Sequence, residues 1–223
     1  MEKIIFWDWT GTLADESQLD KAVCQSIEEG IAHNKKISYK QAQQIFRNYL
    51  KALENRWEWH DYVRHSRHFG LDWKEIQIKN LNKLKILPYV REILIYCENK
   101  GYKNVLATNA VQAVIHLRIN QAGLLDLFEG IIASDEVKAL KAEGKHFEYG
   151  LKIYNGDPQL SFSIGDNPVQ DILSAQKLNL KTVYCDLGQN LTHYHSDHIY
   201  WNHKQAVSAD FCIKNLLEIK KII

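Results

Sequence analysis

The sequence predicts an α/β protein in which an all-helical block is inserted into a parallel-sheet core. Two observations predict this fold class. From residue 88 onward, short apolar runs alternate with helical patterns, as in parallel strands joined by helical crossovers. Between the first apolar run and residue 86, apolar residues recur only at helical spacing. A chain of 223 residues is long enough for one domain that carries such an insertion.

The first predicted element is a buried strand over residues 3–9, and a helical block follows it. One helix is indicated by four apolar residues at helical spacing: Leu19, Val23, Ile27 and Ile31. Two more helices begin at capping-box patterns, in which Ser38 precedes Gln41 and Asp72 precedes Glu75. We find no strand pattern in this block and expect it to form a separate helical domain.

The remaining elements form the predicted core. Pro88 favours the first turn of a helix, and Gly101 favours its carboxyl end. Predicted strands then lie at 104–108, 130–134, 161–164, 182–185 and 211–213. Predicted helices alternate with them at 111–121, 147–154, 169–178 and 216–219. We therefore expect a core of residues 1–14 and 86–223 around a helical insertion of residues 15–85.

The composition is that of an ordinary globular protein, with 45% hydrophobic and 25% charged residues. A formal net charge of +1 favours neither nucleic acid nor an anionic membrane as a partner. The four cysteines are far apart and predict neither a zinc site nor a redox dithiol: Cys24, Cys97, Cys185 and Cys212. The N-terminal apolar run is too short for a signal peptide or a membrane span, so we expect a cytoplasmic protein. The sequence leaves the oligomeric state open.

Polar side chains follow three of the predicted strands at their carboxyl ends. Asp8 follows the first strand, Thr108 and Asn109 end the second, and Asp166 follows a later one. The carboxyl ends of parallel strands meet at one edge of a sheet, where ligands bind. Two carboxylates there suit Mg²⁺, and a hydroxyl with backbone amides suits a phosphate oxygen. A single aspartate could instead be a helix cap, but three strand ends that agree favour a ligand site.

Four short motifs occur in order along the chain. They are Asp8–Thr12 (DWTGT), Thr108–Asn109, Lys141 after Ser134–Val137 (SDEV), and Gly165–Asp171 (GDNPVQD). In this order and spacing they resemble the four motifs of the haloacid dehalogenase (HAD) superfamily. The family pattern at the third motif, S-D-E-V-x-x-x-K-P-x-P-x-x-F, selects Lys141 over Lys138 and Lys145, although both prolines of that pattern are missing here.

The resemblance implies a Rossmann-like core, a helical cap domain over the active site, and Mg²⁺-dependent hydrolysis of a small phosphate monoester. Asp8 would be the nucleophile that forms an aspartyl-phosphate. The metal ligands would be Asp8, the backbone carbonyl of Thr10 and Asp166, with Asp171 supporting them. The groups that bind the phosphoryl oxygens would be Thr108, Asn109, Gly11 and Lys141, and Lys141 would also stabilise charge during the reaction.

Thr10 departs from this pattern, because the phosphatases of the family have a second aspartate at that position. The aspartate protonates the leaving group and then activates water, and losing such a group typically slows a reaction by about 10²–10⁴-fold. One interpretation is a phosphatase that uses another acid, such as His60, His65 or His68, or that acts on a good leaving group. A slow phosphatase, a phosphate-binding protein without catalysis, and a substitution made to trap a complex stay open as well.

Two other branches of the family are weaker alternatives. The phosphonatase branch uses a lysine of the cap domain, where Lys51 and Lys74 stand in this chain. The dehalogenase branch has a tyrosine at the position of Thr10 and needs no metal.

Two further clusters attract attention. Residues 57–68 are rich in aromatic side chains and histidine, and their Arg64 and Arg67 would suit a second anionic group of a substrate, but a packed helix with a solvated face is favoured. Residues 192–198 (THYHSDH) match a dinuclear zinc signature of metallo-β-lactamases. Because this segment lies near the C-terminus and no glycines follow it, a solvated loop is favoured.

Overall fold

The computed structural model describes residues 1–188 and 208–223. Its core is a six-stranded sheet of order β5-β4-β1-β6-β7-β8, in which every neighbouring pair is parallel. The strands are β1 (Lys3–Trp7), β4 (Tyr102–Thr108), β5 (Gly130–Ala133), β6 (Phe162–Gly165), β7 (Lys181–Cys185) and β8 (Phe211–Ile213). The prediction of an α/β protein with a Rossmann-like parallel sheet is confirmed.

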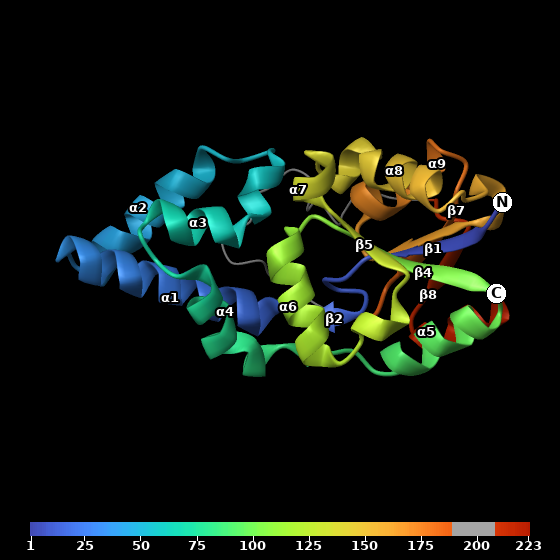
Figure 1. Cartoon of the computed structure of the whole chain (residues 1–223), viewed down its shortest axis with the longest axis horizontal. Helices are drawn as coiled ribbons and strands as arrows, with labels where there is room; N and C mark the ends of the chain where they lie inside the picture. Colours follow the sequence, from blue (N-terminus) through green and yellow to red (C-terminus); the bar gives the residue numbers. More distant parts are fainter. Residues whose placement is uncertain (189–207) are drawn as a thin grey trace.

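Helices cover both faces of this sheet (Figure 1). They are α5 (Val90–Asn99), α6 (Gln112–Ala122), α7 (Ser134–Val137), α8 (Lys145–Ile153) and α9 (Ser174–Gln176). Shorter helical segments are η3 (Leu125–Leu127), η4 (Lys141–Glu143), η5 (Pro158–Leu160), the π-helical turn η6 (Pro168–Leu173) and η8 (Leu216–Lys221). The helix predicted at 169–178 is therefore divided between η6 and α9.

The central strand β1 is apolar on both faces because helices lie on both sides of it. Ile5 and Trp7 belong to one buried cluster, whereas Ile4 and Phe6 belong to another, in which Phe6 meets Phe147 edge-on at 5.4 Å between ring centroids. The strand ends at Trp7 rather than at Trp9 as predicted. The reason is a tight turn, in which the carbonyl of Trp9 accepts the amide hydrogens of residues 12–14.

The helical insertion (residues 15–85, the proposed bounds) lies to one side of the sheet, at the left of Figure 1. Its elements are α1 (Ser17–Lys35), α2 (Tyr39–Lys51), η1 (Trp57–His60), α3 (Tyr62–His68), α4 (Trp73–Asn80) and η2 (Leu81–Lys83). Apolar side chains of α1 and α2 form a buried cluster of their own, which includes Val23, Ile27 and Phe46. The capping box predicted at Ser38 and Gln41 is present at the start of α2.

Two short strands were not predicted. They are β2 (Ala14–Asp15) and β3 (Lys85–Ile86), which pair antiparallel where the chain leaves the core and returns to it. Each strand has two residues, which is too short for an alternating pattern to be recognised.

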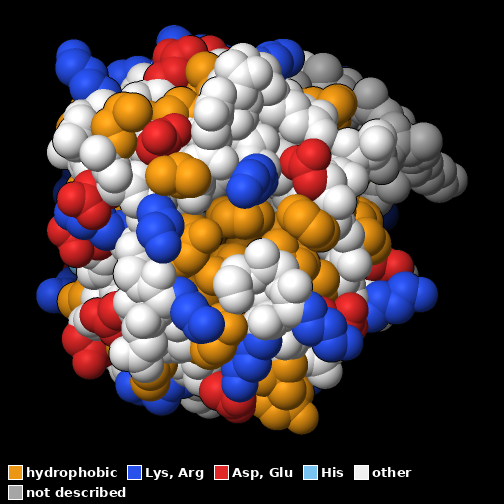
Figure 2. Space-filling view, turned by 90° about the vertical axis from the view of Figure 1, so that its right-hand side faces the viewer, with side chains coloured by type: hydrophobic (Ala, Val, Ile, Leu, Met, Phe, Trp, Pro, Cys, Tyr) orange, Lys and Arg blue, Asp and Glu red, His pale blue; other side chains and the backbone are white. Residues whose placement is uncertain are grey.

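The carboxyl ends of β1, β4 and β6 point toward the helical insertion, since the N-terminus and the start of β1 lie at the far right of Figure 1. Figure 2 shows that opposite end of the molecule, where hydrophobic side chains are surrounded by Lys and Arg. No helix in the described part of the chain is long and apolar enough to cross a membrane. The four cysteines are all free.

His146 of α8 contacts the backbone at the carboxyl end of β4. Its side chain is fully buried, and its Nε2 lies 3.1 Å from the carbonyl oxygen of Thr108 and 3.3 Å from the hydroxyl of Ser134. Burial, with a further contribution from the charge of Lys141, lowers the pKa of His146 to about 3. The imidazole is therefore neutral in the folded protein at neutral pH, and its Nε2 hydrogen is donated to the Thr108 carbonyl.

Acidic pH is expected to destabilise the fold through His146. Its folded pKa of about 3 lies below the ordinary value of 6.5, so below about pH 6.5 the unfolded chain binds more protons than the folded one. The free energy of unfolding should fall as the pH drops, by about 2 kcal/mol at about pH 5 from this residue alone. Urea unfolding between about pH 7 and about pH 5 measures the effect, which should be smaller in His146→Gln.

The matched control is His33→Gln, because His33 is exposed near the end of α1. This variant should keep the pH dependence of the wild-type chain. Buried His65, whose pKa burial lowers to about 4, adds a second contribution that all three proteins share. An unchanged pH dependence in His146→Gln would contradict the assignment.

Candidate active site

Asp8 directly follows β1, and its amide still donates to the carbonyl of Ile164 at 2.9 Å, which fixes the backbone at the sheet edge. One carboxylate oxygen, Oδ1, forms an ion pair with the ammonium group of Lys141. The other, Oδ2, is buried and has no hydrogen-bond partner among the described residues. Burial and the nearby charge of Asp171 raise the pKa of Asp8 to about 7, although Lys141 opposes the shift.

Lys141 is the cation of this site. Its side chain is only 2% exposed, and its Nζ lies 2.6 Å from Oδ1 of Asp171 and 3.2 Å from the carbonyl oxygen of Ala107, in addition to the contact with Asp8. Burial alone would lower the pKa of Lys141, but the charges of Asp171 and Asp8 outweigh it and raise that pKa above its ordinary value. Lys141 is therefore positively charged while buried.

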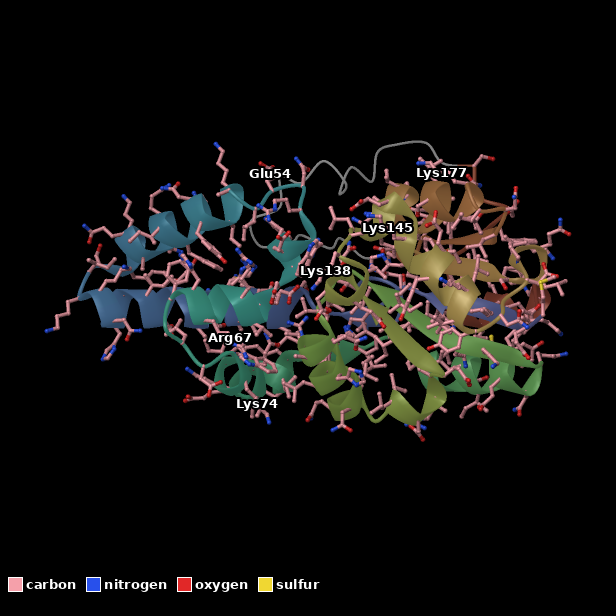
Figure 3. All side chains as sticks on the ribbon, turned by 45° about the horizontal axis from the view of Figure 1, so that its top comes forward. Glu54, Arg67, Lys74, Lys138, Lys145 and Lys177 are labelled. Carbon is pink, nitrogen blue, oxygen red and sulfur yellow. The ribbon has the colours of Figure 1, made fainter. Side chains whose placement is uncertain are left out.

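The two lysines that the motif register set aside lie elsewhere. The Nζ atom of Lys138 lies over the ring of Trp57, 4.8 Å from the ring centroid. This contact is at the boundary between the core and the helical insertion (Figure 3). Lys145 is half exposed and lies 3.6 Å from a carboxylate oxygen of Glu143. Of the three lysines, the structure brings Lys141 alone to the carboxylates.

Asp166 and Asp171 complete an acidic cluster with Asp8, in which one oxygen of each lies within 4.8 Å of the others. Burial, together with the charges of Asp8 and Asp171, raises the pKa of Asp166 well above its ordinary value. Three carboxyl groups face one ammonium group, so the fully ionised cluster has an excess of negative charge. Oxygen ligands with such an excess fit a hard divalent cation.

Asp171 lies behind the other two carboxylates. It is 1% exposed, and its Oδ2 accepts the amide hydrogen of Asn167 at 2.8 Å. Its carboxyl group occupies the space beside Gly165, where a Cβ atom would collide with it. The glycine of the fourth motif is therefore required for the close approach of Asp171 to the sheet edge.

Thr108 and Asn109 both line the pocket but differ in what their side chains do. The hydroxyl of Thr108 accepts the amide hydrogen of Ala110 at 3.1 Å. The side chain of Asn109 accepts the amide hydrogen of Lys141 at 2.8 Å and donates to Oε1 of Gln170 at 2.6 Å. Asn109 thus holds Lys141 and η6 in place through its side chain.

The amide of Gly11 is used within the turn that follows Asp8. The resemblance implied that it binds phosphate, but its amide donates to the carbonyl of Ala14 at 2.7 Å within the turn after Asp8. Its φ of 90° lies in the region that favours glycine. Gly11 therefore shapes this turn, and phosphate binding by Gly11 stays a prediction.

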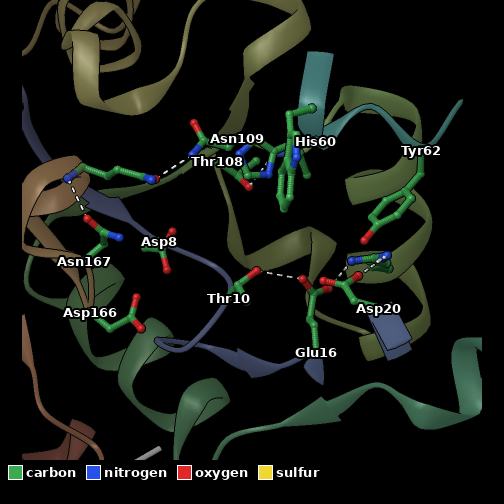
Figure 4. Close-up of a pocket in the computed structure, with 14 residues that line it drawn as sticks. Asp8, Thr10, Glu16, Asp20, His60, Tyr62, Thr108, Asn109, Asp166 and Asn167 are labelled. Carbon is green, nitrogen blue, oxygen red and sulfur yellow. Dashed lines mark hydrogen bonds and ion pairs between the residues drawn. The ribbon is translucent and has the colours of Figure 1, made fainter. Parts of the chain in front are cut away.

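The pocket lies between the sheet edge and the helical insertion (Figure 4). The core contributes its acidic and polar groups to one side, among them Asp8, Asp166 and Thr108. The insertion contributes three aromatic side chains to the other side: Trp59, His60 and Tyr62. A ligand in this pocket would therefore meet residues of both parts of the chain.

Three charged residues in the pocket wall were missed by the sequence analysis: Glu16, Asp20 and Arg118. Arg118 of α6 is 2% exposed, and its guanidinium lies 2.9 Å from Glu16 and 3.0 Å from Asp20. The carboxylates outweigh the effect of burial and raise the pKa of Arg118 above its ordinary value. A signal existed in the sequence, because Arg118 interrupts the apolar stripe of the helix predicted at 111–121.

The three histidines considered as substitute acids differ in whether they reach the pocket. His60 lines the pocket. His65 is buried with its ring nitrogens 2.9 Å from the carbonyl oxygen of Trp59 and 3.3 Å from the hydroxyl of Tyr49, and His68 stacks on Tyr49 at 4.4 Å. The structure therefore brings only His60 of these three to the site.

The two arginines of the cluster at 57–68 are not among the residues that line the pocket. Arg64 and Arg67 are exposed on α3, in agreement with the favoured interpretation of a solvated helix face. The histidine-rich segment 192–198 lies outside the described residues.

Comparison with known proteins gives consistent matches. A family model described as "Haloacid dehalogenase-like hydrolase" matches residues 4–185. A glyceraldehyde 3-phosphate phosphatase of Pyrococcus abyssi is 27% identical over 198 residues, covering 85% of this chain and 83% of that protein. The enzyme of the same name from Methanothermobacter thermautotrophicus is 23% identical with full coverage of both chains, 100% each. The crystal structure of a HAD phosphatase from Thermococcus onnurineus has a TM-score of 0.82 at 25% identity, covering 99% of this chain and 97% of that one.

These matches confirm the resemblance inferred from the four motifs. The relatives are named as phosphatases, which supports the expected phosphoric monoester hydrolase. Because the family model spans more than half of the sequence, this chain belongs to the haloacid dehalogenase-like hydrolase family.

Proposed function

We propose that the protein is a Mg²⁺-dependent phosphatase that hydrolyses a small phosphate monoester through an aspartyl-phosphate on Asp8. The observation that carries this proposal is the state of the Asp8 carboxylate. Lys141 holds one of its oxygens, while the other is unpartnered among the described residues, in a pocket that Thr108 and Asp166 also line. A carboxylate oriented in this way can attack phosphorus.

The acidic cluster supports the metal in this proposal. Asp8, Asp166 and the backbone carbonyl of Thr10 would hold Mg²⁺, and Asp171 would support them from behind through its contact with Lys141. Bound there, Mg²⁺ would neutralise the excess carboxylate charge and that of the phosphoryl group.

The residues of this chain would act as follows. Oδ2 of Asp8 attacks phosphorus, the bond to the leaving alcohol breaks, and water later attacks the aspartyl-phosphate to restore Asp8. The hydroxyl of Thr108 donates to a phosphoryl oxygen. The ammonium group of Lys141 stabilises the charge that builds on those oxygens.

The pocket and the relatives together support the substrate class. The helical insertion serves as a cap in this proposal, since Trp59, His60 and Tyr62 would contact the leaving group. Glyceraldehyde 3-phosphate is the first candidate substrate, because relatives covered over most of their length are named for it. A cytoplasmic location and the lack of nucleic-acid or membrane partners stay predictions.

The phosphonatase alternative receives no support from the described residues. Lys51 and Lys74 are both exposed, whereas a lysine that forms a Schiff base needs burial or a neighbouring cation to lower its pKa. The acidic cluster likewise disfavours a metal-free dehalogenase.

Replacing the nucleophile tests the proposed function. Asp8→Asn should lose at least about 10³-fold in kcat, because an amide cannot form the aspartyl-phosphate. The measurement is phosphate release from glyceraldehyde 3-phosphate and p-nitrophenyl phosphate with Mg²⁺. Asp126→Asn is the matched control, since Asp126 is exposed on η3, and it should keep wild-type activity. If the wild-type chain binds phosphate but releases none from any monoester, it is a binding protein instead.

Binding of Mg²⁺ can be measured without turnover. Mg²⁺ should raise the Tm of the wild-type chain, because it binds the folded acidic cluster and relieves the repulsion there. Asp166→Asn should have a higher Tm than wild type in EDTA, since a buried carboxyl group that is unfavourable to ionise becomes a neutral amide. The variant should also respond more weakly to Mg²⁺. Calorimetric melting with EDTA, with Mg²⁺ and with NaCl of equal ionic strength separates binding from screening. An equal Mg²⁺ response in Asp166→Asn would contradict the assigned ligands.

A further inference from the structure

Thr10 leaves the proposed phosphatase without an obvious proton donor, and its surroundings identify a replacement. The hydroxyl of Thr10 donates a hydrogen bond to Oε2 of Glu16 at 2.7 Å. Both residues line the same pocket as Asp8, and Figure 4 shows Thr10 between Asp8 and Glu16. Because the hydrogen of this hydroxyl is directed at Glu16, a lone pair of Oγ1 is left to accept a hydrogen from the pocket side.

Glu16 is held in one orientation on the pocket wall. Its side chain is 3% exposed, and its other oxygen, Oε1, accepts from Nε1 of Trp9 at 2.7 Å and from the guanidinium of Arg118 at 2.9 Å. Oε2 is thereby directed toward Thr10. A carboxylate fixed in this manner can take a proton from the Thr10 hydroxyl or return one to it without rearranging.

A purely structural role for Glu16, as the counterion of Arg118, explains less of this arrangement. Arg118 already has Asp20 as a partner, 3.0 Å away and also in the pocket wall. Two carboxylates on one guanidinium leave the group with a net negative charge, so Glu16 is not needed to neutralise Arg118. The ion pair with Arg118 uses Oε1 of Glu16, so it does not account for the hydrogen bond between Oε2 and the Thr10 hydroxyl.

We propose that the Thr10 hydroxyl and the Glu16 carboxylate form a proton relay that replaces the missing acid–base aspartate. The proposal rests on the function proposed above. In the second step, the oxygen of water bonds to phosphorus as the bond from phosphorus to Asp8 breaks. The water gives a proton to Oγ1 of Thr10, which passes its own proton to Oε2 of Glu16.

The first step of the next turnover uses that proton. As the bond between phosphorus and the leaving oxygen breaks and Asp8 bonds to phosphorus, the leaving oxygen takes the Thr10 hydrogen. Oγ1 of Thr10 then recovers a proton from Glu16, which is a carboxylate again. One monoester and one water are consumed, and one alcohol and one phosphate are formed, with no other reactant.

The experiment compares leaving groups, because only a weakly acidic alcohol needs a proton as it departs. The variants are Glu16→Gln, Thr10→Val, which keeps the Glu16–Arg118 pair intact, and Thr10→Ser, which keeps a hydroxyl. The substrates are p-nitrophenyl phosphate, phenyl phosphate and glyceraldehyde 3-phosphate. The reference variants are Asp20→Asn, which removes the other carboxylate on Arg118, and His60→Gln.

Glu16→Gln and Thr10→Val should lose about 10²–10⁴-fold in kcat/KM for glyceraldehyde 3-phosphate, but less than about tenfold for p-nitrophenyl phosphate. Both should release a burst of p-nitrophenol equal to the enzyme concentration, since water attack is slowed and the aspartyl-phosphate accumulates. Thr10→Ser keeps a hydroxyl and, unlike Thr10→Val, should keep activity close to that of the wild type on all three substrates. Asp20→Asn should keep the wild-type dependence on the leaving group.

Equal losses on all three substrates would assign Glu16 a structural role and overturn the relay. The same holds if Glu16→Gln and Thr10→Val keep wild-type rates, or if His60→Gln alone shows the dependence on the leaving group. If Glu16→Gln does not fold, Thr10→Val decides the question by the same criteria. Failure of the proposed function is distinct, because the wild-type chain would then hydrolyse no monoester, or Asp8→Asn would retain activity.

Discussion

The buried contact between Lys141 and the carboxylates of Asp8 and Asp171 is the interaction on which the site depends. Charged groups are stable in a protein interior only when they are paired, and removing one partner leaves an uncompensated charge. Here the three side chains come from the end of β1, from η4 and from η6. Their mutual attraction therefore fixes the distances among three segments that are far apart in the sequence.

Neutral groups around this contact hold it in register. Asn109 orients the backbone of Lys141, His146 supports the carbonyl of Thr108 from α8, and Gly165 leaves space for the carboxyl group of Asp171. None of these three residues needs to touch a ligand to matter. They keep the excess carboxylate charge in a small volume, and this is the property that makes the cluster suited to a divalent cation.

A second buried cation, Arg118, joins the core to the helical insertion. Its helix, α6, belongs to the core, while its partners Glu16 and Asp20 precede or open α1 and its partner Gln77, 3.2 Å away, lies on α4. Both cations contact the surroundings of the segment from Asp8 to Thr10. Lys141 is paired with Asp8, and Arg118 is paired with Glu16, which accepts the hydroxyl hydrogen of Thr10. The pocket is thus a joint product of both parts of the chain, as its mixed lining shows.

Much of this arrangement could be predicted from the sequence, because it depends on local patterns. Apolar runs and helical spacing indicate a parallel sheet with an inserted helical block, and polar residues after strands predict which edge carries the site. The four motifs indicate the family and select Lys141. What only the tertiary structure decided is which charges meet: that Arg118 pairs with Glu16, that Glu16 faces Thr10, and that the amide of Gly11 is used within its own turn. Such contacts depend on the packing of distant segments, and the free energy of burying a charge is set by its final neighbours rather than by its place in the sequence.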